Sequence, residues 1–357
     1  MPGPSPDSLS IIGLRAGRYR TQHDGWKVRE IIVVSDLGEC GLIARIVARL
    51  AAAGSSPAVV LGPGDDAAVV RAADGRVAVT TDVLVEGVHF RRDWSTGYDV
   101  GRRAAAANLA DIAAMGAHPT ALVVGLATPG DLPVDWVDAL ADGFRDEATQ
   151  AGATVVGGDV VSSPTLVVSV TALGDLHGHA PVTRSGARPG DAVVVAGRLG
   201  FAAAGLALLH AGRPDAELAD AHRRPAVPYE AALRLAVLGA TSMIDVSDGL
   251  VADLGHLAQA SGVGIELARD DLPLPAELVD AALAVGADPL SWVANGGDDH
   301  AFAATLPADL ALRAVAELAD LPEPVPFAQV GRVVTGSGVV FVDGPAPAAN
   351  GWDHFRP

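Results

Sequence analysis

The sequence predicts a protein of two α/β domains built from α+β layers. Apolar runs typical of strands alternate with helix-length segments in both halves, and the strand content is too high for a helical bundle. A stretch rich in turn residues, PVTRSGARPGD, separates the halves. We therefore expect an N-terminal domain at 35–182 and a C-terminal domain at 183–357. Residues 1–34 show no sustained period, and we expect them to form a disordered extension.

Composition narrows the class of protein. The chain has 357 residues, half of them hydrophobic, and a formal net charge of −18, which argues against a nucleic-acid or anionic-membrane surface. No uncharged apolar run reaches 18 residues, and residues 1–30 lack the apolar core of a signal peptide, so we expect a cytoplasmic protein without a membrane segment. Cys40 is the only cysteine, which excludes an internal disulfide and a cysteine-rich zinc site.

The first half should begin with a helix whose apolar residues repeat at helical spacing from Leu42. Two short apolar runs follow, the second ending at Asp82, and then a long Ala-rich helix that Asp99 could cap. On that helix Asn108 and Asp111 are three residues apart and share a face. The remaining elements are expected to be a strand at 121–128, a helix at about 133–151, and strands at 155–161 and 165–176.

The second half should open with a strand at 191–197 and continue with helices near 200–211 and 228–239. The apolar stretch SMIDVSDGL reads as a strand that contains Asp245, Ser247 and Asp248, and a helix at 250–261 follows directly. The N-terminal amides of that helix could help to hold a phosphate. A strand after GGDDH and two more at 327–333 and 338–342 complete the half.

Acidic residues recur beside Gly, Ser or Thr at the ends of these strands. They are Asp65 with Asp66, Asp82, Asp159, Asp245 with Asp248, and Asp298 with Asp299; Asp111 adds one more on the Ala-rich helix. Like charges brought together in a cleft need cations between them, and hard oxygen ligands suit Mg²⁺ or Mn²⁺. The glycine-rich phosphate loop ending in Lys-Ser/Thr is absent, as are the protein-kinase motifs. Any phosphoryl transfer should therefore rely on several metal ions.

The chain resembles the thiamine-monophosphate kinase family in eight segments that keep that family's order and spacing. They are GPGDDAAVV, TTDVLVEGVHF, NLADIAAMGA, VVGGDVV, TRSGARPGD, IDVSDGL, GGDDHAF and GWDHF. That family belongs to the ATP-binding superfamily that also holds aminoimidazole ribonucleotide synthetase and selenophosphate synthetase. The resemblance covers about residues 37–355 and implies the two-domain fold of that superfamily. It also implies a homodimer in which the N-terminal sheets pair into a barrel.

The resemblance further implies ATP-dependent phosphorylation of thiamine monophosphate to thiamine diphosphate, the last step of thiamine diphosphate synthesis. Several Mg²⁺ ions would assist direct in-line transfer of the γ-phosphate, and no general base is expected, because the acceptor oxygen is already ionised. The implied metal ligands are Asp66, Thr80, Thr81, Asp82, Asp111, Asp159, Asp245 and Asp248. The implied nucleotide contacts are Arg184, Ser247, Gly158 and Asp159. The implied thiamine monophosphate contacts are His89, Asp298 and Trp352.

Two departures from the family pattern keep other interpretations open. GGDDH stands where Gly-Gly-Glu-Asp-Tyr is usual, so Asp298 is one methylene shorter and His300 replaces a phenol; Trp352 stands where tyrosine is usual. Taken singly, His89 could be structural, Ser247 could only cap a helix, Arg184 could be a solvated surface residue and Trp352 could only pack. The alternative functions are a sister enzyme, such as a selenophosphate or purine-pathway synthetase, and a non-catalytic nucleotide-binding relative.

Overall fold

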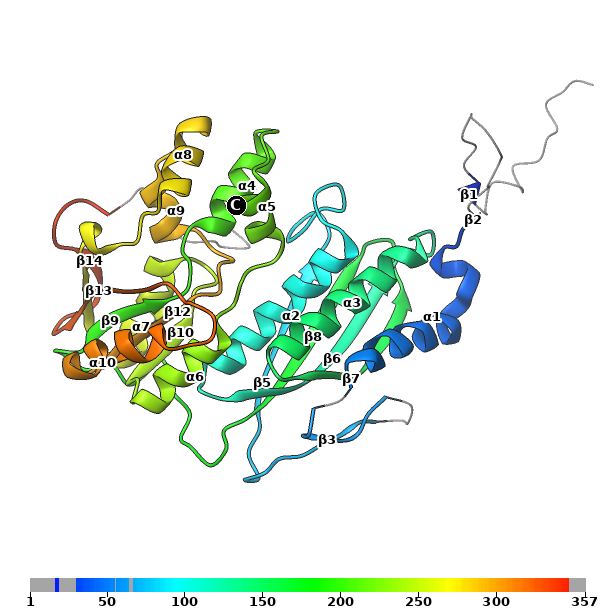
Figure 1. Ribbon diagram of the computed structural model, residues 1–357, viewed down its shortest axis with the longest axis horizontal. Helices are drawn as coiled ribbons and strands as arrows, with labels where there is room; N and C mark the ends of the chain where they lie inside the picture. Colours follow the sequence, from blue (N-terminus) through cyan, green and yellow to red (C-terminus); the bar gives the residue numbers. More distant parts are fainter. Residues whose placement is uncertain (1–16, 19–29, 55, 64–66, 347–357) are drawn as a thin grey trace, which may run out of the picture.

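The chain folds into two α/β halves that lie side by side (Figure 1). The computed structural model describes residues 17–18, 30–54, 56–63 and 67–346. Most of the expected extension at 1–34 lies outside the described residues, as do the candidate ligand Asp66 and the candidate substrate contact Trp352. The α/β layers expected for both halves are present. Among the described helices, none is long and apolar enough to cross a membrane.

The first half alternates helices with strands up to the connection that follows Asp175. Its elements are β1 Gly17–Arg18, β2 Glu30–Ile31, α1 Val34–Leu50, a 3₁₀ turn at Ala51–Ala53, β3 Val59–Leu61, β4 Val69–Val70, β5 Ala78–Val85, α2 Gly97–Ala114, β6 His118–Thr128, α3 Val134–Gln150, β7 Thr154–Ser162 and β8 Val167–Asp175. Helix α1 begins eight residues before Leu42, and Gly38, at φ 64°, kinks it. The other helices and strands expected here are confirmed to within a few residues, but β5 continues to Val85, so the prediction that Asp82 ends its strand was wrong.

A four-stranded sheet of order β5-β8-β6-β7 forms the first half. Strands β6 and β7 are parallel, and the other neighbours are antiparallel. Helices α2 and α3 cover one face of this sheet (Figure 1). The other face carries exposed valines, with Val79 65%, Val83 46% and Val161 51% exposed. We call this valine-bearing surface the open face.

Helix α2 starts with a reciprocal cap. The side chain of Thr96 accepts from the amide of Asp99, and the carboxylate of Asp99 accepts from the amide of Thr96 at 2.8 Å. The prediction that Asp99 is the capping residue was therefore wrong: Thr96 is the N-cap, and Asp99 is the acidic partner three residues later.

Helices α2 and α3 approach so closely that their contact requires glycine. A Cβ atom on Gly101 would lie 2.2 Å from the carbonyl oxygen of Leu140, and one on Gly143 would lie 2.2 Å from that of Tyr98. Backbone therefore packs directly on backbone where the helices cross. The small residues of the Ala-rich helix, noted in the sequence, serve this contact.

The second half is built around a larger sheet. Its elements are β9 Ala192–Ala196, α4 Phe201–His210, α5 Ala216–Arg223, α6 Tyr229–Leu238, β10 Ser242–Asp245, α7 Leu250–Ser261, β11 Gly264–Leu267, a 3₁₀ turn at Arg269–Asp271, α8 Ala276–Val285, α9 Pro289–Asn295, β12 Phe302–Leu306, α10 Ala308–Ala319, β13 Phe327–Val334 and β14 Gly338–Phe341. Strand β10 ends at Asp245, so the prediction that Ser247 and Asp248 lie in the strand was wrong: they lie in the turn before α7.

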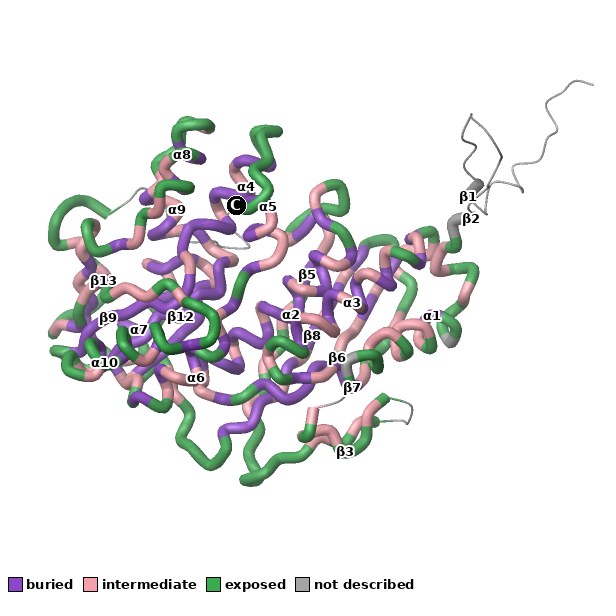
Figure 2. Tube along the Cα trace, in the orientation of Figure 1, coloured by how far each residue is buried: buried purple, intermediate pink, exposed green. Residues whose placement is uncertain are grey.

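The second sheet has the order β10-β12-β9-β13-β11-β14, and only β11 and β14 are parallel. Both of its faces are covered. Ala192 and Val194 of β9 join a core that also contains residues of α2, α3 and α6, whereas Val193 and Val195 face a second core under α4, α7 and α9. Buried segments of the chain therefore continue from one half into the other without interruption (Figure 2). One continuous core joins them.

The glycine contact between α2 and α3 predicts opposite effects for two Gly→Ala changes in helices. Gly143→Ala should lower the free energy of unfolding by about 1–3 kcal/mol or more, because the new methyl group meets backbone atoms that cannot move aside. Gly255→Ala in α7 has nothing within 4 Å and should raise it by about 0.5–1 kcal/mol, since alanine favours the helix. Urea unfolding of both variants tests this, and equal effects would contradict the packing.

Candidate functional site

Strand β5 and helix α2 bring four predicted or noted polar residues together. The side chains of Thr80 and Asp82 point toward α2, because residues two apart share one face of a strand. The hydroxyl of Thr80 donates to Asp111 Oδ2 at 2.7 Å, and the amide of Asp82 donates to Asn108 Oδ1 at 2.9 Å. Asn108 is fully buried and is itself anchored to the carbonyl of Ala104 at 3.0 Å. The geometry of Asp111 and Asp82 is therefore set by a rigid helix and a sheet.

The second half adds Asp245 and His300 to the same place. Asp245 ends β10 and His300 precedes β12, its antiparallel neighbour. His300 Nδ1 lies 3.0 Å from Asp245 Oδ2, and both side chains are buried. We call Asp82, Asp111 and Asp245 the acidic cluster.

Two members of the acidic cluster, Asp82 and Asp111, have raised pKa values. Burial, the charge of Asp245 and that of Asp82 raise the pKa of Asp111 to about 7, although the hydroxyl of Thr80 acts in the opposite direction. Burial and then Asp245 also raise the pKa of Asp82. Burial alone would lower the pKa of His300, but its hydrogen bond to Asp245 and the surrounding carboxylates outweigh burial and raise it. Three carboxylates facing one imidazole favour a bound cation.

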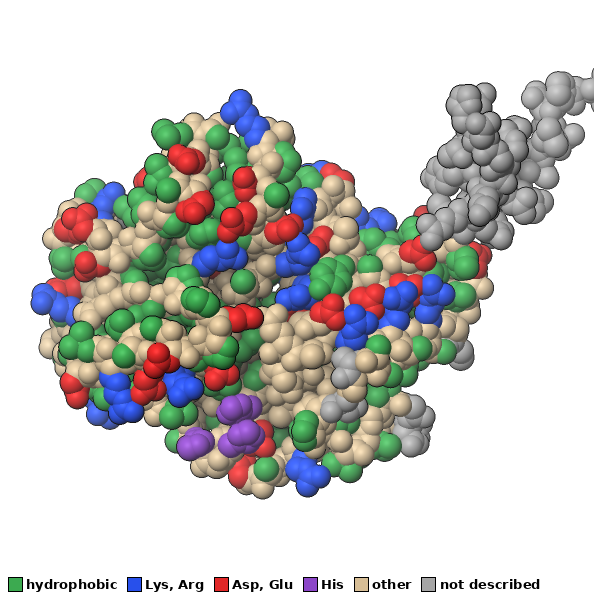
Figure 3. Space-filling model, viewed as in Figure 1, with side chains coloured by type: hydrophobic (Ala, Val, Ile, Leu, Met, Phe, Trp, Pro, Cys, Tyr) green, Lys and Arg blue, Asp and Glu red, His purple; other side chains and the backbone are tan. Residues whose placement is uncertain are grey.

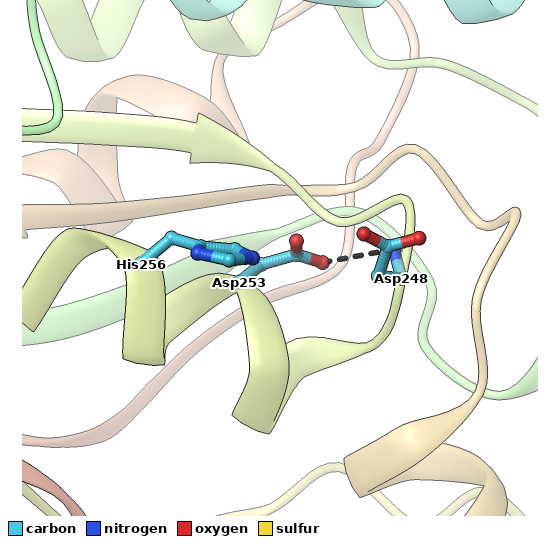
Figure 4. A group of neighbouring side chains, drawn as sticks. All are labelled: Asp248, Asp253 and His256. Atoms are coloured by element: carbon cyan, nitrogen blue, oxygen red, sulfur yellow. Dashed lines mark hydrogen bonds between the residues drawn. The ribbon is translucent and has the colours of Figure 1, made fainter. Parts of the chain in front are cut away.

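A second acidic group lies where α7 begins (Figure 4). Asp253 Oδ2 accepts from the amides of Ser247, Asp248 and Gly249, each at 3.1 Å. Burial, with the charges of Asp245 and Asp248, raises the pKa of Asp253 to about 7. The ligand atoms of Asp248, Asp253 and His256 lie within 4.8 Å of one another, so these residues could hold a cation beside the acidic cluster.

The contacts of Asp253 add a residue that the sequence analysis did not predict. Asp253 occupies the three amides of the turn before α7, whereas the phosphate was expected at the amides of Leu250 and the residues after it, so that expectation stays a prediction. Asp253 and His256 were not predicted as part of the site. The signal available in the sequence was an acidic residue in the first turn of the helix after Gly249, a position that favours capping of the helix amides.

The GGDDH turn packs on the same segment. The amide of Asp298 donates to the carbonyl of Ser247 at 2.9 Å, and that of His300 donates to the carbonyl of Val246 at 3.0 Å. Asp298 and His300 have positive φ angles of 65° and 49°, a strained conformation that is typical of functional turns. The buried carboxylate of Asp299 accepts from the amides of Gly200 and Ala202 at the start of α4, and burial raises its pKa to about 7. Hydrogen bonds to the segment before α7 and to the start of α4 therefore fix the GGDDH turn.

Asp298 also contacts the first half of the chain. Arg103 Nη2 of α2 donates to Asp298 Oδ2 at 2.6 Å. Burial acts to raise the pKa of Asp298, but Arg103, His300 and His222 together outweigh burial and hold the pKa below its usual value. Arg103 was not predicted, because its partner lies 195 positions away. A charged residue among the alanines of α2 was the only signal.

The remaining predicted residues are not all brought to the cluster. His89 Nδ1 accepts from the amide of Val85 at 3.0 Å, and His89 is among the groups that lower the pKa of Asp82, so it lies nearby. Thr81 points away from Thr80 and bonds to the carbonyl of Val170. Asp159 is exposed and pairs in register with Gly125, whereas Gly158 lies so close to β6 that a Cβ atom would be 2.1 Å from the carbonyl of Val124.

The backbone of Arg184 lies at the opposite end of α7 from Asp248. Its side chain is exposed, and its carbonyl accepts from the hydroxyl of Ser261 at the C-terminal end of α7. Asp248 precedes the N-terminal end of this 12-residue helix, a separation of about 18 Å along its axis. The nucleotide contact expected for Arg184 stays a prediction.

Charged side chains also line the junction between the halves (Figure 3). A cavity of about 420 Å³ lies there, lined among others by Arg102 and Gln150 of the first half and by Arg198 and Arg224 of the second. It includes no residue of the acidic cluster. Arg224 Nε lies 3.3 Å from Asp99 Oδ1, so this ion pair ties the two halves together.

Comparison with known proteins assigns the family. The N-terminal and C-terminal domains of AIR synthase related protein match residues 64–176 and 188–344. A thiamine-monophosphate kinase from Mycobacterium tuberculosis is 47% identical over 339 residues, which cover 94% of this chain and 97% of the relative. The chain belongs to the thiamine-monophosphate kinase family. The resemblance inferred from the eight segments is thereby confirmed.

Two solved structures of the thiamine-monophosphate kinase family share the fold. The enzyme from Stenotrophomonas maltophilia K279a superposes with a TM-score of 0.74 at 36% identity, covering 85% of this chain and 96% of that one. AaThiL complexed with AMPPCP and TMP gives a TM-score of 0.71 at 33% identity, with 93% and 100% covered. The two-domain aminoimidazole ribonucleotide synthetase-like fold expected from the sequence is confirmed.

The raised pKa values of Asp111, Asp253 and Asp299 predict that stability without metal falls as pH rises. The pKa of Asp111 is near 3.8 in the unfolded chain and about 7 in the fold, so its protonation stabilises the fold and this stabilisation is lost as pH rises toward and past 7. Asp253 and Asp299 act in the same direction. In EDTA, the free energy of unfolding should fall by a few kcal/mol between pH 5.5 and pH 8.

Urea unfolding at the two pH values measures this loss. Asp111→Asn is the matched variant and should show a smaller loss, because its amide does not titrate. Added Mg²⁺ should stabilise the wild-type protein more at pH 8 than at pH 5.5, since protons compete with the cation. The same pH dependence in both proteins would show that Asp111 does not titrate as described.

Proposed function

We propose that the protein transfers the γ-phosphoryl group of ATP to thiamine monophosphate, forming thiamine diphosphate and ADP. The observation that carries this proposal is the acidic cluster: three carboxylates from both halves, two with raised pKa values, in a chain 47% identical to a thiamine-monophosphate kinase. The related AaThiL was solved with AMPPCP and TMP together. The curated relative supports this kinase activity over that of a sister synthetase.

The acidic cluster fits Mg²⁺ as the metal. Its ligand atoms are carboxylate oxygens, which hard divalent cations prefer, and burial together with the charges of Asp245 and Asp82 raises the pKa of Asp111, an effect that a bound cation would oppose. Asp82, Asp111, Asp245 and Asp248 would supply the carboxylates, and we propose more than one ion. Bound Mg²⁺ would neutralise charge on the approaching phosphates. Asp66 remains a proposed ligand outside the described residues.

The protein's own residues then have to position two polyanions. The acceptor is a phosphate oxygen that is ionised at neutral pH, so no general base is required. Rigid elements hold the cluster: Thr80 fixes Asp111, and His300 fixes Asp245. Fixed geometry of this kind removes much of the entropic barrier to transfer. Catalysis is therefore positioning together with charge neutralisation.

We propose that thiamine monophosphate lies between the two halves, against His89 and Asp298. His89 is held by β5 close to Asp82, and Asp298 is half exposed in the GGDDH turn. Asp298 can pair with the aminopyrimidine or with the thiazolium charge of the substrate. Trp352 is proposed as the stacking residue and lies outside the described part of the chain.

We propose further that two copies pair through the open face. Exposed valines on this face suit a second sheet of the same kind, which would close a barrel between the N-terminal domains. Thr81 and Asp159 belong to the same face, so the dimer would enclose them. Their metal role and the nucleotide roles of Asp159, Gly158, Ser247 and Arg184 stay proposals, as do the domain boundary near 182 and the cytoplasmic location.

The activity is tested by product chromatography with purified protein, Mg²⁺ and ATP. Thiamine diphosphate should form from thiamine monophosphate and not from thiamine. Asp245→Asn should lower kcat/KM about 100-fold or more, because it removes charge that holds the cation. Asp280→Asn, at an exposed position of α8, should leave it unchanged. Near-normal turnover in Asp245→Asn would contradict the metal assignment, and absence of product from the wild-type protein would contradict the function.

The dimer is tested by sedimentation of a variant of the open face. Val83→Lys should shift the protein from dimer to monomer, because a charge would be buried between two apolar sheets. Leu283→Lys places the same charge on α8, where leucine is 78% exposed, and should leave the dimer intact. A monomeric wild-type protein, or a dimer unaffected by Val83→Lys, would contradict the proposed pairing.

A further inference from the structure

Arg103 connects the two halves through one buried guanidinium group. It lies on α2, and its side chain is only 7% exposed. Nη2 donates to Asp298 Oδ2 at 2.6 Å, and Nη1 donates to the carbonyl of His222 at 3.0 Å. The two acceptors belong to separate segments of the second half, so both contacts require the halves to be correctly placed.

The contact leaves Asp298 able to bind something else. The side chain of Asp298 is 46% exposed, whereas that of Arg103 is sequestered. A carboxylate has two oxygens that accept hydrogen bonds, and Arg103 donates to Oδ2. Oδ1 can therefore accept from a ligand while Arg103 fixes the orientation of the group. The backbone of Asp298 is fixed separately, by the carbonyl of Ser247.

The same helix carries the first half's share of the metal site. Asn108 and Asp111 follow Arg103 on α2, and Asn108 is bonded to the strand that bears Asp82. Eight residues of helix separate Arg103 from Asp111, or about 12 Å along the axis. A rigid helix thus links the position of Asp298 to that of the acidic cluster.

We propose that Arg103 is a positioning residue that orients Asp298 toward the aminopyrimidine or the thiazolium cation of the phosphate acceptor. It thereby sets the distance between the organic part of the substrate and the acidic cluster. This inference rests on the proposed function and assigns Arg103 a specificity role for the acceptor, not for the nucleotide.

The test compares Arg103→Met with Arg103→Lys by steady-state kinetics. Arg103→Met should raise KM for thiamine monophosphate at least tenfold and leave KM for ATP within twofold. Arg103→Lys keeps the charge and loses the planar fork, so it should restore part of the affinity. The double variant Arg103→Met/Asp298→Asn should bind the acceptor no more weakly than Asp298→Asn alone, because Arg103 acts through Asp298.

Arg224→Met is the matched control for the loss of an ion pair between the halves that does not involve Asp298. Arg224 also forms an ion pair with α2, through Asp99 at 3.3 Å, but its partner is not Asp298. This variant should lose stability without a change in KM for thiamine monophosphate. An equal rise in KM in Arg224→Met, or an unchanged KM in a folded Arg103→Met, would overturn the inference.

A calorimetric measurement of thiamine monophosphate binding in the absence of ATP distinguishes a failure of the proposed function from a failure of the role proposed for Arg103. If the wild-type protein binds the acceptor but forms no product, the proposed function fails, and weaker binding by Arg103→Met still supports the inference. If product forms normally and binding is equal in both proteins, the inference alone fails. Failure of the wild-type protein to bind thiamine monophosphate would overturn both.

Discussion

The repulsion among buried and partly buried carboxylates at the junction is the constraint on which the rest of the site depends. Asp82, Asp111 and Asp245 come from two strands and a helix in different halves, and their mutual charge, together with burial, keeps protons on Asp111 up to about pH 7. Without a cation, partial protonation, the contact of His300 with Asp245 and the hydrogen bond from Thr80 to Asp111 offset this repulsion. A group of carboxylates that lowers the stability of the fold in the absence of metal should bind a metal tightly, because binding relieves the repulsion among the carboxylates.

Helix α2 connects the acidic cluster to the rest of the molecule. It packs backbone to backbone on α3, holds β5 through Asn108, and reaches the second half through Arg103. Its alanines make the continuous core possible, because bulkier side chains would separate the sheet, α3 and the second half. The packing between the two halves and the positions of the site residues therefore both depend on the 18 residues of α2. The position of the acceptor's binding group relative to the metals follows from the rigidity of this one helix.

The sequence predicted most of the strands and helices. The resemblance to the family implied a shared site for Thr80, Asp82, Asp111 and Asp245, and the structure brings these four residues together, although Thr80 and Asp82 lie inside β5 and not at its end. The alternation of strand residues could also have separated Thr81 from Thr80 and Asp82. Sequence patterns could not reveal the pairing of Arg103 with Asp298, which depends on the packing of two halves. Nor did they show that Asp253 turns back onto the amides before α7, because only the tight turn after Asp245 brings those amides within reach.

The central claim is that Asp82, Asp111 and Asp245 together hold a divalent cation. Electron paramagnetic resonance of Mn²⁺, a substitute for Mg²⁺, tests it directly, because the signal of free Mn²⁺ is lost on binding. The account predicts that the wild-type protein binds Mn²⁺ with AMPPCP present and that Asp245→Asn binds it at least tenfold more weakly, with Asp280→Asn unchanged. Equal Mn²⁺ binding by the wild-type protein and Asp245→Asn would contradict the claim.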